Sequence, residues 1–127
     1  MEELTNNVNW LAVTIGFVVA FVFGWLWYSP KLFGTKWATG VGLDDATQKM
    51  PLNAMITQGA GTFLLAWLVG ITAASDALLT IILIVIAFIV LLTANGLFVG
   101  KSRQAIAIEA GFIFVMAIIM IVFQGVF

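Results

Sequence analysis

The chain has 127 residues, of which 63% are hydrophobic and 9% are charged, and its formal net charge is −1. A soluble domain is usually about half apolar and about a quarter charged, so this composition excludes an ordinary water-soluble fold and suits a lipid bilayer. The absence of cysteine and histidine excludes disulfides, thiolate or imidazole metal sites and catalytic groups that need either residue, and the charge offers no basic face for nucleic acid.

The first stretch long and apolar enough to span a bilayer covers about residues 8–28. Ser29 and Pro30 end it, because proline cannot continue a helix. Glu2 and Glu3 precede it where a signal peptide would be basic, so we expect this span to remain in the mature protein. Amphipathic aromatic rings favour the membrane–water interface. We expect five of them, in this span and the following loop, to act as interface anchors: Trp10, Trp25, Trp27, Tyr28 and Trp37.

The loop over residues 29–51 is the longest connection in the chain. Its first half combines apolar and basic residues in a pattern typical of a short amphipathic helix in the membrane interface. The residues of that pattern are Leu32, Phe33 and Trp37 with Lys31 and Lys36. We expect Asp44 or Asp45 to cap one further helical turn before Pro51. The loop is either a connector with anchors, or a lid or docking surface for a cytoplasmic partner.

Three more spans follow, over about residues 52–73, 77–99 and 104–127. The links between them have only a few residues, so neighbouring helices must be antiparallel. The sequence therefore predicts an all-α membrane protein with a single four-helix transmembrane domain over residues 1–127. The four helices form an antiparallel up-down bundle, with a short interfacial helix in the first loop.

Small residues recur at four-residue spacing on the first two spans. Such stripes let helix backbones approach closely, which is how helices pack in lipid. The stripes pack helices either within the chain or between chains, and we expect packing within the chain. The residues are Gly16, Ala20, Gly24, Ala66 and Gly70.

Basic residues predict the direction of insertion, because lysine and arginine stay on the cytoplasmic side. All five lie in the first and third loops: Lys31, Lys36, Lys49, Lys101 and Arg103. We therefore expect loop 29–51 in the cytoplasm and both termini on the periplasmic or extracellular side.

Polar side chains inside the spans are few, and an ionisable group there is a functional candidate. Glu109 is the only acid in a predicted span, and Gln58 and Asn95 lie at a similar depth from the same side. We expect the three to form an intramembrane polar site. Either they fix the bundle through interhelical hydrogen bonds, or Glu109 carries a proton or cation with the amides as co-ligands. Lys101 and Arg103 are close enough in sequence to pair with Glu109.

Specific motifs occur in the first third of the chain. Asn9-Trp10-Leu11-Ala12 is followed by Trp27-Tyr28-Ser29-Pro30, Leu32-Phe33-Gly34 and Trp37. In these motifs, and around Asn95, Leu97-Phe98 and Glu109-Ala110-Gly111, the chain resembles a bacterial membrane-protein family catalogued as domain of unknown function 1761. The resemblance implies a bacterial four-helix membrane protein and brings no catalytic residue or substrate. It also implies that an amide often replaces Glu109, which weakens a general proton-carrier role.

From these features we expect a protein of the bacterial inner membrane that is a structural or accessory subunit. Its partners are the lipid bilayer and either further copies of itself or other membrane subunits. The alternative is a small proton- or cation-linked transporter or channel component that uses Glu109. We expect no enzyme activity, because no nucleophile, base or metal constellation is visible, and no cofactor or nucleic-acid partner.

Overall fold

The computed structural model describes residues 2–29, 31–42 and 52–127. Within these ranges the regular structure is helical: α1 (Glu2–Thr5), α2 (Trp10–Trp27), α3 (Gly34–Gly40), α4 (Leu52–Ala74), α5 (Leu78–Phe98) and α6 (Arg103–Val126). Helices α2, α4, α5 and α6 are long and apolar enough to cross a membrane, and they match the four predicted spans to within a few residues. The expected cap at Asp44 or Asp45 lies outside the described residues.

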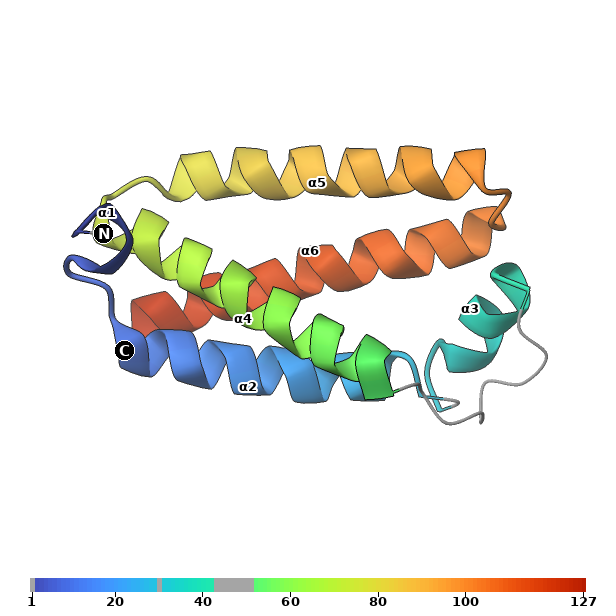
Figure 1. Cartoon of the computed structure of the whole chain (residues 1–127), viewed down its shortest axis with the longest axis horizontal. Helices are drawn as coiled ribbons and strands as arrows, with labels where there is room; N and C mark the ends of the chain where they lie inside the picture. Colours follow the sequence, from blue (N-terminus) through green and yellow to red (C-terminus); the bar gives the residue numbers. More distant parts are fainter. Residues whose placement is uncertain (1, 30, 43–51) are drawn as a thin grey trace.

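The four long helices lie side by side along the long axis of the molecule (Figure 1). The two termini, α1 and the link between α4 and α5 lie at one end, whereas α3 and the link between α5 and α6 lie at the other. Helix α6 packs against α2, α3, α4 and α5, so it is the central helix of the bundle.

Local signals fix where the long helices begin and turn. The side chain of Asn9 accepts a hydrogen bond from the Ala12 amide at 3.1 Å, and Ser102 does the same for the Ala105 amide at 3.0 Å. Each bond satisfies an N–H group that the first turn of a helix leaves without a partner. Between α5 and α6, Gly100 has a φ of +81°, a left-handed conformation that glycine adopts without a steric penalty.

The bundle core is apolar, and the two buried polar residues within the described ranges are satisfied by the backbone. Thr62 donates its hydroxyl to the carbonyl of Gln58 at 2.7 Å, and Thr72 donates to the carbonyl of Val69 at 2.9 Å. Around them the largest fully buried apolar side chains come from all four long helices: Val13, Val69, Ile81 and Met120.

The small residues of α2 and α4 lie inside the bundle. Gly16, Ala20 and Gly24 are buried on α2, as are Ala66 and Gly70 on α4. A Cβ atom added to Gly16 would lie 3.6 Å from the Cα atom of Met120 on α6, and one added to Gly70 would lie 2.7 Å from the Val13 side chain on α2. These glycines therefore permit close contact between helices of the same chain.

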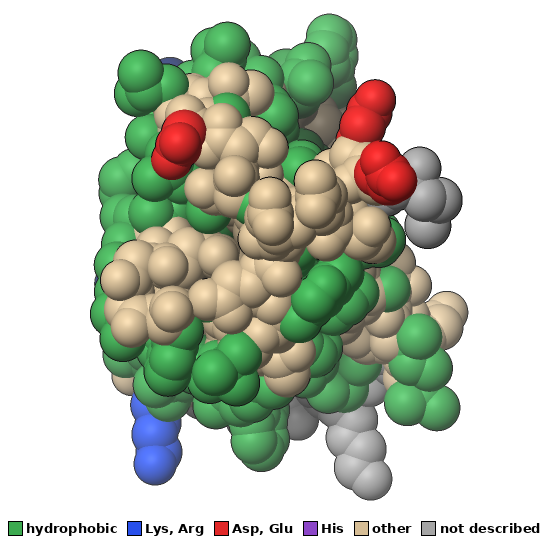
Figure 2. All heavy atoms as spheres, turned by 90° about the vertical axis from the view of Figure 1, so that its left-hand side faces the viewer, with side chains coloured by type: hydrophobic (Ala, Val, Ile, Leu, Met, Phe, Trp, Pro, Cys, Tyr) green, Lys and Arg blue, Asp and Glu red, His purple; other side chains and the backbone are tan. Residues whose placement is uncertain are grey.

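The outer surface of the bundle is strongly apolar. Leu79 and Phe98 on α5 are 83% and 89% exposed. Viewed from the end that holds the termini, hydrophobic side chains make up much of the periphery, whereas acidic side chains lie on the end face among other polar groups and backbone (Figure 2). Such large apolar surfaces are unfavourable in water and are covered by lipid in a membrane. With four membrane-length helices, the chain is a multi-pass membrane protein.

Candidate functional site

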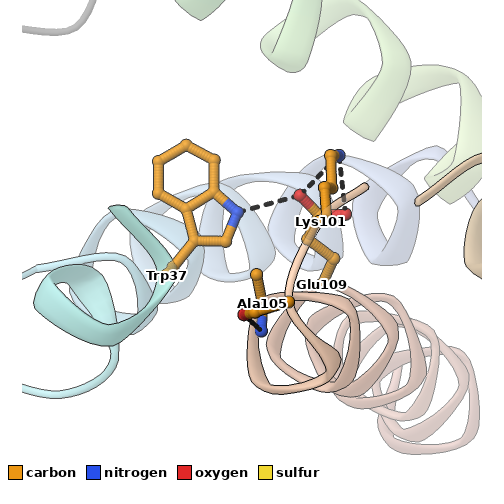
Figure 3. Close-up of polar contacts among 5 residues, drawn as sticks. Trp37, Lys101, Ala105 and Glu109 are labelled. Atoms are coloured by element: carbon orange, nitrogen blue, oxygen red, sulfur yellow. Dashed lines mark hydrogen bonds and ion pairs between the residues drawn. The ribbon is translucent and has the colours of Figure 1, made fainter. Parts of the chain in front are cut away.

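The candidate site is centred on the carboxylate of Glu109, about two turns into α6. Its Oε2 atom accepts a hydrogen bond from the indole Nε1–H of Trp37 at 2.8 Å. The ammonium group of Lys101 donates to Oε1 at 3.1 Å and to Oε2 at 3.0 Å (Figure 3). The side chains of Lys101 and Glu109 are only 22% and 12% exposed. The carboxylate thus has a charged partner and a neutral partner from two different segments.

The backbone around the α5–α6 link brings Lys101 to this position. After the reversal at Gly100, the Lys101 amide donates to the Gly96 carbonyl at 2.9 Å, which closes the end of α5. The next amide, that of Ser102, donates to the Gly40 carbonyl at the end of α3 at 3.0 Å. The link that carries Lys101 is therefore tied both to α5 and to α3.

Aromatic packing holds Trp37 in place. Its ring meets that of Tyr28 edge-on, with a centroid distance of 5.2 Å. The Tyr28 ring in turn meets the buried ring of Phe112 on α6 at 5.4 Å. Helix α3 is thus attached to the bundle by ring contacts as well as by the hydrogen bond to Glu109.

The aromatic residues expected to anchor the chain in the interface have different environments. Trp10 and Trp25 are 41% and 75% exposed, near opposite ends of α2. Trp27 and Trp37 instead point toward α6: the Trp27 indole donates to the Ile108 carbonyl at 3.1 Å, and that of Trp37 donates to Glu109. These two indoles join elements of the fold, a role that the aromatic-belt interpretation missed.

The structure does not connect Gln58 or Asn95 with Glu109. Gln58 is exposed on α4 and donates to the Thr62 hydroxyl at 3.3 Å, and Asn95 is exposed on α5. Among the described residues, no hydrogen bond joins either amide to the Glu109 carboxylate. The described donors to this carboxylate are Lys101, to both oxygens, and Trp37, to one of them. The expected site of three polar residues is thus an ion pair capped by an indole.

The chemistry open to this arrangement follows from its charges. Lys101 neutralises the Glu109 carboxylate, and three hydrogen bonds fix its orientation. In the part of the chain that the structure describes, no group of three or more acidic side chains is placed to hold a metal ion. The partly buried Glu109 carboxylate can thus join α6 to the α5–α6 link through the ion pair with Lys101, and to α3 through the hydrogen bond from Trp37.

Comparison with known proteins assigns the chain to a family. No curated protein and no solved structure matches it. The family model described as Protein of unknown function (DUF1761) matches residues 11–125. This range includes α3, α4 and α5 in full and nearly all of α2 and α6, together with Trp37, Lys101 and Glu109. The relationship expected from the tryptophan-rich motifs is confirmed, and the chain belongs to the DUF1761 family.

Proposed function

We propose that the chain is a structural or accessory subunit in the bacterial inner membrane, in a homo-oligomer or with other membrane subunits. The observation that carries this proposal is the environment of Glu109, the one acid within the predicted spans. A carrier carboxylate must release and rebind its ion, whereas this one is held by Lys101 and Trp37. We infer that Glu109 stabilises the fold and carries no ion.

Removing either partner of the Lys101–Glu109 ion pair should destabilise the fold. Taking a charge out of water costs several kcal/mol, which the attraction of a well-placed partner offsets. Removing one partner of a fully buried pair typically costs about 3–5 kcal/mol, because the other charge stays buried and unpaired. Lys101 and Glu109 keep some exposure, so we expect a smaller loss here. The ion pair ties the α5–α6 link to α6, and the Trp37 hydrogen bond to the same carboxylate adds the contact from α3.

The membrane arrangement is part of the same proposal. We propose an antiparallel four-helix bundle, with α3 in the interface on the cytoplasmic side and both termini on the opposite side. The distribution of charge supports it. Lys36 lies in α3, and Lys101 and Arg103 lie where α5 passes into α6, whereas α1 at the other end holds Glu2 and Glu3 (Figure 1, Figure 2).

The experiment that tests the proposed role is a flux measurement in liposomes. The purified protein and its Glu109→Gln variant are reconstituted with a pH-sensitive dye inside, and a proton gradient or cation gradient is applied. Asp76→Asn, which removes an exposed acid from the α4–α5 link, is the matched control. We expect all three proteins to match protein-free liposomes. A flux in the parent protein that Glu109→Gln abolishes and Asp76→Asn retains would establish the transport alternative.

A further inference from the structure

An open groove lies between the segment around α3 and the beginning of α6, away from the Glu109 carboxylate. Its volume is about 250 Å³. It combines an apolar floor with a polar rim and is lined by Trp27, Phe33, Lys36, Gln104, Ala107 and Ile108.

The apolar floor of the groove is held in shape by its own contacts. The Trp27 indole is fixed by its hydrogen bond to the Ile108 carbonyl at 3.1 Å. Its ring lies close to Gly111 of α6, where an added Cβ atom would come within 3.3 Å of it. On the other side, the Phe33 ring packs on the Trp27 ring with a centroid distance of 4.6 Å. The floor is therefore formed before any ligand arrives, which lowers the entropic cost of binding.

The rim of the groove carries the positive charge of Lys36. Lys36 is exposed, and it forms no ion pair with any other residue that the structure describes. Lys101, by contrast, is occupied by Glu109. Gln104 is also exposed and adds an amide donor at the rim. The rim thus suits an anionic oxygen group, whereas the floor suits hydrocarbon.

The depth of the groove in the membrane indicates a ligand that has both an anionic group and a hydrocarbon chain. Trp27 is the last residue of α2, and Gln104 follows the first residue of α6. One membrane-length helix ends here and another begins, so the groove lies where the hydrocarbon region meets the lipid headgroups. Basic pockets between spanning helices at this level bind anionic headgroups.

We propose that this groove binds an anionic phospholipid. The phosphate lies at Lys36 and Gln104, and the first methylene groups of an acyl chain lie against Trp27, Phe33 and Ile108. The proposal rests on the membrane arrangement given above and is independent of whether Glu109 carries an ion. A free phosphate ion would use only the rim and leave the apolar floor without a partner.

The test is lipid binding to the purified protein in detergent, followed by native mass spectrometry. Phosphatidylglycerol, phosphatidylcholine and inorganic phosphate are the three probes. We expect tighter binding of phosphatidylglycerol than of phosphatidylcholine. Lys36→Gln should weaken phosphatidylglycerol binding about fivefold, the effect of one lysine near an anionic surface. It should weaken phosphatidylcholine binding less, because the choline ammonium group already offsets the charge of that lipid's phosphate. Ala107→Leu, which fills the groove at an exposed position, should weaken phosphatidylglycerol binding as well.

Matched controls separate this site from general attraction to lipid. Lys31→Gln removes an exposed charge that does not line the groove, and Ala87→Leu enlarges an exposed residue on α5; both should bind phosphatidylglycerol like the parent. Thermal unfolding shows whether each variant is folded. Equal binding of the two lipids, or an equal loss in Lys31→Gln, would overturn the proposal. Displacement of phosphatidylglycerol by an equal concentration of inorganic phosphate would identify a free anion as the ligand and also overturn it.

Discussion

Gly24 of α2 lies directly against the ring of Phe112 on α6: a Cβ atom added to Gly24 would be 2.7 Å from the Cζ atom of that ring. Phe112 is 4% exposed, and its ring contacts those of Trp27 and Tyr28 at centroid distances of 6.4 and 5.4 Å. The ring is therefore confined on several sides, and the close approach of α2 to α6 depends on the absence of a side chain at Gly24.

A larger residue at Gly24 should destabilise the bundle. We expect Gly24→Leu to lower the free energy of unfolding by about 1–3 kcal/mol, the usual cost of overpacking, and Gly24→Ala to lower it less. Val22 is 56% exposed on the same helix, so Val22→Leu should change stability little. Thermal unfolding in detergent measures all three. Equal shifts for Gly24→Leu and Val22→Leu would contradict this packing.

The docking of α3 on α6 gives a second prediction. A Cβ atom added to Gly40 would lie 2.5 Å from the Cβ atom of Ala105 and would also contact the Ser102 hydroxyl. Helix propensity alone favours alanine over glycine. If Gly40→Ala nevertheless loosens α3, the steric clash with α6 must be the cause. We expect Gly40→Ala to increase hydrogen exchange of the α3 amides, whereas the exposed control Thr39→Ala leaves it near the parent level. Unchanged exchange in Gly40→Ala would show that α3 is not seated here.

The orientation can be tested with single cysteines, because the chain has none of its own. Thr35 in α3 and Ser75 between α4 and α5 are both exposed and uncharged, so their replacement keeps the charge pattern. In intact cells an impermeant thiol reagent should label Ser75→Cys, and it should label Thr35→Cys only after the membrane is opened. The reverse pattern would place α3 outside the cell.

The four spans could be predicted from the sequence because the bilayer requires each spanning segment, by itself, to be long and apolar enough. The positions of α2, α4, α5 and α6 therefore followed from local composition. The glycine and alanine stripe of α2 was informative for a similar reason, since four-residue spacing places its members on one face.

Of the two partners of Glu109, Lys101 was within reach by its distance in sequence, but Trp37 could not be predicted in the same way. Counting residues gives depth along a helix but not which way each side chain faces around the bundle, so Gln58 and Asn95 were grouped with Glu109 by depth alone. Trp37 lies 72 residues from Glu109 in the chain, and a tryptophan near a membrane interface is explained equally well by anchoring. The overlooked signal was an indole N–H donor in the first loop that needed an acceptor once its ring was packed.

The most direct test of the central claim, that Glu109 holds α3 to α6, is a double-mutant cycle with Trp37. Trp37→Phe keeps an aromatic ring but removes the N–H donor, and Glu109→Leu removes both acceptor oxygens. The free energy of unfolding is measured in mixed micelles for the parent, the two single variants and the double variant. Hydrogen bonds to charged groups contribute about 1.5–3 kcal/mol, so we expect a coupling energy of about 1–2 kcal/mol at this partly exposed site. Single-variant losses that add to within about 0.5 kcal/mol would contradict the claim.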